Sequence, residues 1–134
     1  MANVIVSTPH HSDSRLRVWT GRVLTGLIAS FLLLDAVGKL IPIQAALEGT
    51  RELGYSANVL RPLGVVLALS TSLHLVPRTE LVGALLLTAY LGGATATHVR
   101  TGTPFWFAVA MGMLLWIAYY LRSPALRAFL STAR

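Results

Sequence analysis

The sequence contains no cysteine and few charged side chains, and each shortage excludes a class of protein. Without cysteine there is no thiol–disulfide relay, no iron–sulfur cluster and no cysteine-ligated zinc site. Charged residues make up only 12% of the 134 residues, whereas 54% are hydrophobic. Soluble domains have about a quarter of their residues charged, and a soluble domain of this size could not hide so much apolar surface from water. The composition therefore predicts an integral membrane protein in contact with lipid.

Acidic residues are scarcer than basic ones. The chain has 5 Asp and Glu against 11 Lys and Arg, which gives a formal charge of +6. In a soluble domain such a balance would suggest nucleic-acid binding. Here the basic residues lie between long apolar runs, so we expect them to face anionic lipid headgroups, and we expect no nucleic-acid partner.

Four apolar segments predict four transmembrane helices. Each has about 17–23 residues, which matches a hydrocarbon core of about 30 Å at a rise of 1.5 Å per residue. Proline or glycine residues separate each segment from the next. The predicted fold is all-α, an integral membrane four-helix bundle with short loops. The segments cover residues 18–40, 60–76, 80–99 and 104–121.

Outside the four apolar segments, the sequence predicts an N-terminal tail and one long loop. Residues 1–17 are polar and predict a flexible tail, and residues 18–134 form a single domain. The loop over residues 41–59 is the longest, and its spacing predicts a short amphipathic helix at the membrane interface that ends at Gly54.

The distribution of Lys and Arg predicts the orientation in the cell membrane. Seven lie in the two tails and the Pro77 turn, against four on the opposite face. The positive-inside rule then places both termini of this multi-pass protein in the cytoplasm. The seven are Arg15, Arg17, Arg22, Arg78, Arg122, Arg127 and Arg134; the four are Lys39, Arg51, Arg61 and Arg100.

Two groups of polar residues interrupt the apolar segments. Asp35 and Lys39 are four residues apart and therefore lie on one face of the first helix. They form either an ion pair that fixes the depth of the helix in the membrane or part of a functional site. The third helix closes with six small residues over 92–97, followed by His98. Such a run admits a packed helix or a flat ligand, and histidine supplies a group that titrates near neutral pH.

Topology predicts that these groups meet. The first and third helices run in the same direction, so their ends and the 41–59 loop share one mouth of the bundle. There we predict the catalytic candidates Asp35, His98 and Glu48, the ligand-binding candidates Lys39, Arg51, Tyr90, Thr97, Arg100 and Trp106, and no metal site. His74 lies at the other end beside the Pro77 turn, where we expect it to be interfacial.

Several strings, in this order and spacing, resemble the DoxX-like membrane proteins over residues 22–127. They are RVLTGLIASFLLLDAVGKL, EGTRELGY, RPLGVVLALST and VPRTELVGALLLTAYLGGATATHVR, followed by the helix of Trp116. The motifs that carry the likeness are Asp35-x-x-x-Lys39, Glu48-Gly49-Thr50, Gly54-Tyr55, Pro77-Arg78-Thr79 and Thr97-His98-Val99-Arg100. His74 departs from the apolar or aromatic residue expected before the Pro-Arg-Thr turn.

The resemblance implies a four-helix membrane bundle but does not fix the function, because one fold hosts many functions. Related proteins include a subunit of a thiosulfate:quinone oxidoreductase and a partner in a membrane oxidoreductase complex with superoxide dismutase and a sulfurtransferase. More distant four-helix relatives include receptor-assembly chaperones and, by architecture alone, sterol isomerases.

Three functions stay open. The first is a redox-linked protein that binds a quinone or a similar lipophilic small molecule, with His98 exchanging a proton. The second is a cofactor-free isomerase, cyclase or hydrolase, with Asp35 or Glu48 as the acid and His98 as the base. The third is a non-catalytic assembly or chaperone subunit. A quinone is the one cofactor suggested, and redox partner proteins or further copies of the chain are the candidate protein partners.

Overall fold

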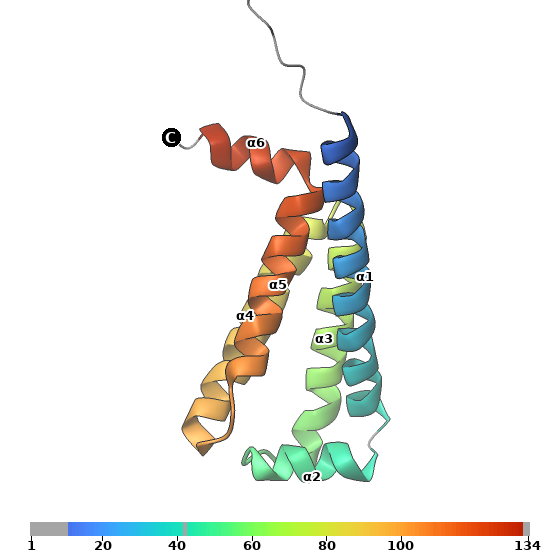
Figure 1. Ribbon diagram of the computed structural model, residues 1–134. Helices are drawn as coiled ribbons and strands as arrows, with labels where there is room; N and C mark the ends of the chain where they lie inside the picture. Colours follow the sequence, from blue (N-terminus) through green and yellow to red (C-terminus); the bar gives the residue numbers. More distant parts are fainter. Residues whose placement is uncertain (1–10, 42, 133–134) are drawn as a thin grey trace, which may run out of the picture.

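The computed structural model describes residues 11–41 and 43–132, and the regular structure within these ranges is entirely helical. In Figure 1 the four long helices α1, α3, α4 and α5 run alongside one another, α2 lies across one end, and α6 projects sideways at the other. The elements are α1 (His11–Leu40), α2 (Gln44–Glu52), the 3₁₀ helix η1 (Ala57–Val59), α3 (Leu60–Leu75), α4 (Glu80–Thr101), α5 (Trp106–Arg122) and α6 (Pro124–Thr132).

The observed helices follow the predicted segments closely, with one exception at the start. α1 begins at His11, so the prediction of a flexible tail is wrong for residues 11–17. Arg and Leu in that stretch are good helix formers, which lets the helix continue past the apolar run. Residues 1–10 of the predicted tail lie outside the described residues. The short helix predicted in the long loop is present as α2, and Gly54 follows it with a φ of 78°.

Sequence reasoning missed α6. This helix begins directly after Ser123, whose Oγ accepts a hydrogen bond from the backbone N–H of Leu126 at 3.2 Å. Serine followed by proline is a common start of a helix, because the hydroxyl caps a free N–H and proline suits the first turn. The axes of α5 and α6 differ by 95°. The elbow is held by Arg127, whose Nη1 donates to the carbonyls of Tyr120 and Leu121 at 2.9 and 2.8 Å.

The helices have the length and composition of membrane spans. Among the described residues, three helical stretches are long and apolar enough to cross a bilayer, and a fourth qualifies if α5 and α6 count as one bent span. α5 alone has 17 residues, at the lower limit for crossing a hydrocarbon core. The structure thus supports three or four membrane spans, whereas the sequence predicts four separate ones.

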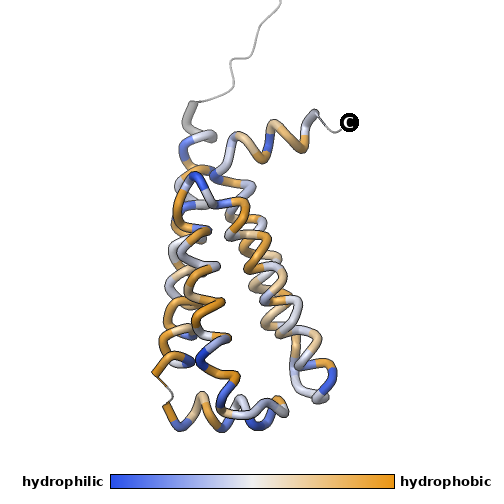
Figure 2. Tube along the Cα trace, turned by 180° about the vertical axis from the view of Figure 1, so that it is seen from behind, coloured by the Kyte–Doolittle hydropathy of each residue, from blue (hydrophilic) through white to orange (hydrophobic). Residues whose placement is uncertain are grey.

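The outer surface of the long helices is apolar. Leu27, Leu34, Leu85 and Ile117 are 65%, 72%, 54% and 47% exposed. Figure 2 shows hydrophobic residues along most of the long helices, with hydrophilic ones gathered toward their ends and on α2. A soluble monomer rarely exposes so large an apolar surface, whereas lipid solvates it favourably. This surface agrees with a membrane protein.

Three glycines lie where the backbones of two long helices approach each other closely. A Cβ on Gly83 of α4 would lie 2.1 Å from the backbone nitrogen of His74 on α3, and one on Gly21 of α1 would lie 2.9 Å from that of Arg122 on α5. Both contacts are at the α6 end. At the α2 end, a Cβ on Gly64 of α3 would lie 2.9 Å from Cβ of Lys39 on α1. Small residues permit such close backbone approach. The α1–α3 pair is therefore close at the α2 end, where α4 and α5 lean away (Figure 1).

Candidate functional site

A cavity of about 480 Å³ lies between these diverging helices at the α2 end. Its volume is within the usual range of small-molecule sites. The wall is mostly apolar, with contributions from every long helix. A limited set of polar side chains also reaches it: Asp35, Lys39, Thr50, Tyr55, Tyr90, Thr97 and His98. The apolar wall consists of Phe31, Leu32, Leu53, Leu63, Ala89, Leu91, Gly93, Ala94, Pro104, Phe107, Ala108 and Met111.

Asp35 and Lys39 form the predicted ion pair, with the Lys39 ammonium donating to Oδ1 of Asp35. The side chains of Lys39 and Asp35 are 19% and 38% exposed. An isolated charge at this depth in a bilayer costs several kcal/mol, and pairing offsets part of that cost. The ammonium carries three N–H donors and the carboxylate two oxygens, so the pair keeps free donor and acceptor capacity toward the cavity.

His98 stands near the end of α4 and also lines the cavity. Its Nδ1 lies 2.8 Å from Oγ1 of Thr103, in the turn that follows α4. That turn folds back because Gly102 adopts a φ of 68°, a conformation that glycine tolerates best. Within the described part of the chain, Nε2 of His98 has no partner. One ring nitrogen is thus fixed by the protein, and the other is left for a ligand or a proton.

Tyr55 and Thr97 close the end of the cavity. Thr97 Oγ1 donates its one hydrogen to the carbonyl of Gly93 at 2.9 Å. Because that hydrogen is already used, the phenol of Tyr55 is the donor in its 2.8 Å hydrogen bond with Thr97 Oγ1. Arg100 adds a second tie, because its Nη2 donates to the carbonyl of Leu53 at 3.3 Å and its guanidinium lies 5.9 Å from the centre of the Tyr55 ring. The segment after α2 is therefore fastened to α4 as a cover.

The structure brings together only part of the predicted site. Asp35, Lys39, Tyr90, Thr97 and His98 all line the cavity. The other four candidates do not: Glu48 and Arg51 are exposed on α2, Arg100 holds the cover from outside, and Trp106 is 70% exposed and stacks on Phe105. Sequence reasoning missed Thr50 and Tyr55, which enter from the long loop, where spacing alone does not tell which residues turn inward.

His74 belongs to a different cluster, at the α6 end. The prediction that it is interfacial is wrong, because its side chain is 2% exposed. Nδ1 lies 3.1 Å from the carbonyl of Glu80, and Nε2 lies 3.3 Å from Nη2 of Arg122. A carbonyl and a guanidinium require Nδ1 to donate and Nε2 to accept. Arg122 also pairs with Glu80 at 2.7 Å, and the imidazole meets the ring of Tyr119 edge-on.

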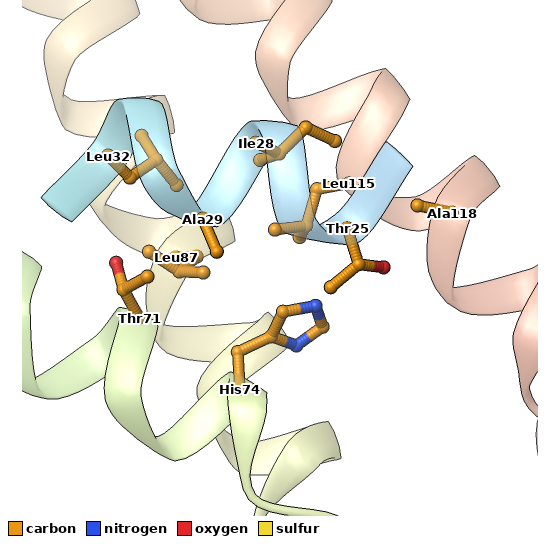
Figure 3. Close-up of a pocket in the computed structure, with 9 residues that line it drawn as sticks. All are labelled: Thr25, Ile28, Ala29, Leu32, Thr71, His74, Leu87, Leu115 and Ala118. Atoms are coloured by element: carbon orange, nitrogen blue, oxygen red, sulfur yellow. The ribbon is translucent and has the colours of Figure 1, made fainter. Parts of the chain in front are cut away.

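This second cluster has no room for a ligand. Figure 3 shows His74 and Thr71 facing Thr25, Ala29 and Leu87 across a narrow gap. The cavity volume there is about 0 Å³, too small for even one water molecule. The His74 cluster therefore ties α3, α4 and α5 together, and of the two cavities only the one at the α2 end has room for a small molecule.

Comparison with known proteins identifies a family for this chain. The sequence profile of the DoxX-like family matches residues 23–120, well over half of the chain. Neither a curated protein nor a solved structure matches the chain. The family match covers α1 from Val23 through most of α5, including every element that lines the cavity. The chain belongs to the DoxX-like family of membrane proteins.

Proposed function

We propose that this membrane protein binds a quinone-like lipophilic molecule in the 480 Å³ cavity and supports redox chemistry by exchanging protons with it. One observation carries the proposal: the Asp35–Lys39 pair and the free Nε2 of His98 share an otherwise apolar cavity. Apolar walls with a few convergent polar groups are typical of sites for flat lipophilic ligands.

The residues fit a quinone head group. The Lys39 ammonium can donate a hydrogen bond to a carbonyl oxygen, and the Asp35 carboxylate balances its charge. His98 can donate or accept a proton at Nε2, because Thr103 holds only Nδ1. Phe31, Leu32 and Phe107 offer apolar surface to the ring and the tail. A bound quinone would accept two electrons and two protons, and the electrons would come from a redox partner protein.

A second candidate is a cofactor-free acid–base enzyme acting on a lipophilic metabolite. The observation that favours it is the presence of Asp35, Tyr90 and His98 in one apolar cavity, where proton transfer needs no redox partner. An isomerase, cyclase or hydrolase would use these groups as acid and base. Conversion of a purified lipophile by the protein alone would favour this function over the first.

Quinone binding to the purified protein in lipid nanodiscs tests the proposal. We expect Lys39→Met and His98→Ala each to weaken binding of a short-tailed benzoquinone at least about tenfold, because each removes a buried polar contact to the head group. Glu48→Gln is the matched control, since Glu48 is exposed and does not line the cavity. Equal affinity in wild-type protein and both cavity variants would contradict the proposal.

A further inference from the structure

The connection between α2 and α3 covers one end of the cavity. Tyr55 and Leu53 belong to this connection, and both are tied to α4, through Thr97 and Arg100 respectively. Thr50, at the end of α2, is buried beneath the same cover. A ligand that entered beneath this connection would have to break these contacts.

The side between α1 and α5 is bridged by two aromatic rings. Phe31 of α1 and Phe107 of α5 meet edge-on, with ring centroids 5.2 Å apart. Both rings line the cavity and both are partly exposed to the surroundings of the bundle. An aromatic pair in this geometry is mutually attractive, so it stabilises closure on this side.

The side between α3 and α4 is different, because α4 presents almost no side chain there. Ala89 and Gly93 are both exposed, yet both line the cavity. A Cβ placed on Gly93 would have nothing within 4 Å. From α3, Leu63 is the residue that lines the cavity.

The position of Gly93 on α4 identifies this side. Trp116 of α5 donates from Nε1 to Oγ1 of Thr88 at 2.9 Å, so the Thr88 flank of α4 faces α5. Gly93 lies about 140° around the helix from Thr88, and therefore on the flank away from α5. It also lies about 7.5 Å along the helix axis from His98, nearer the middle of the helix.

We infer that the ligand enters sideways from the bilayer, through an opening bordered by Leu63, Ala89 and Gly93. The inference rests on the proposed function and names the ligand class: a membrane-resident lipophile with a polar ring and an apolar tail. The ring reaches Lys39 and His98 while the tail passes beside Gly93 into the lipid.

A pair of neighbouring glycines supplies the test. Gly93 lines the cavity, whereas Gly92 is also exposed and has nothing within 4 Å of its Cβ position but does not line the cavity. We expect Gly93→Leu in nanodiscs to weaken or slow binding of a decyl-tailed benzoquinone at least about tenfold, the loss seen when a pocket rejects a group by shape. Gly92→Leu should match the wild type. The equilibrium affinity for a tail-less benzoquinone should be nearly unchanged in both variants, because a bound ring without a tail leaves nothing in the opening.

Modification after folding separates the effect of added bulk on ligand binding from any effect of a substitution on folding. Gly93→Cys and Gly92→Cys each introduce a single thiol into the cysteine-free chain. A bulky methanethiosulfonate reagent added to the folded protein should block the tailed quinone at position 93 only, and reduction should restore binding.

Each outcome of these experiments is decisive. Unchanged binding of the tailed quinone after modification at position 93, or equal losses at positions 92 and 93, would overturn the sideways route. Equal loss of the tailed and tail-less quinones at position 93 would also overturn it. Failure of the wild-type protein to bind either quinone would overturn the proposed function itself.

Discussion

The phenol of Tyr55 donates a hydrogen bond to Oγ1 of Thr97 over a distance of 2.8 Å, and this contact joins residues 42 positions apart in the chain. It fastens the connection that follows α2 onto the last turns of α4. The hydrogen bond therefore helps to hold this connection over the polar end of the cavity, together with the tie from Arg100 to Leu53.

Tyr55→Phe should loosen this cover without emptying the space beneath it, because phenylalanine keeps the ring. We expect the free energy of unfolding to fall by about 0.5–1.5 kcal/mol, the net value of one hydrogen bond. We also expect a cysteine at position 94 to react faster with a water-soluble thiol reagent. Ala94 lines the cavity in a chain without native cysteine. Tyr120→Phe is the control, since Tyr120 is exposed on α5. The same labelling rate in both variants would show that Tyr55 does not hold the cover.

Asp35 and Lys39 should behave as a coupled pair. Asp35→Asn and Lys39→Met each leave one charge without its partner, whereas the double variant leaves none. We expect the double variant to lose less stability than the sum of the two single losses, by about 0.5–3 kcal/mol. Unfolding in mixed micelles measures the change in the free energy of unfolding for each of the three variants relative to the wild type. Asp35→Asn with Arg51→Met is the uncoupled comparison and should be additive; strict additivity for Asp35 and Lys39 as well would contradict the pairing.

His74→Leu should destabilise the protein without removing a ligand site. Leucine has a similar volume, so the loss reports the hydrogen bonds to Glu80 and Arg122, about 1–3 kcal/mol for buried partners left unpaired. Thermal unfolding in detergent measures it, with Ser72→Leu on the exposed face of α3 as the comparison. A melting temperature equal to that of Ser72→Leu would show that the cluster contributes nothing to stability.

Orientation in the membrane stays a prediction of the Lys and Arg distribution. We expect a cysteine at position 78 to face the cytoplasm with both termini, and a cysteine at position 48 to face the other side. Glu48 and Arg78 are both exposed, so either single thiol is accessible to a membrane-impermeant maleimide applied to intact cells. Labelling of both positions from the same side would disprove this topology.

The main features of the fold and part of the site follow from the sequence. Apart from the start of α1, which lies seven residues before the predicted one, the predicted boundaries of the long helices hold to within two residues. The count of crossings places Asp35 and His98 at the same end of the bundle. Their joint lining of one cavity agrees with that prediction. Physical reasoning succeeds here because helix direction alternates and side-chain position along a helix is fixed by its rise.

Features that depend on contacts between distant elements were missed. The sequence does not reveal that His74 is buried, because its partners Glu80 and Arg122 come from other helices. The close contact at Gly83 beside it also has no signature in residue spacing. Glu48 was expected in the mouth, but the face that a short loop helix turns inward depends on how the loop docks. In this fold it is Thr50 that is buried, while Glu48 is exposed.

Photoaffinity labelling measures directly where a lipophilic ligand binds in the protein. A quinone carrying an azide on its ring would be activated by light with the protein in nanodiscs, and the modified peptides identified by mass spectrometry. We predict labels on α1 near Asp35 and on α4 near His98, with the His98→Ala variant losing most of them. Labels confined to the α6 end, or spread evenly over the lipid-facing surface and unaffected by His98→Ala, would contradict the account.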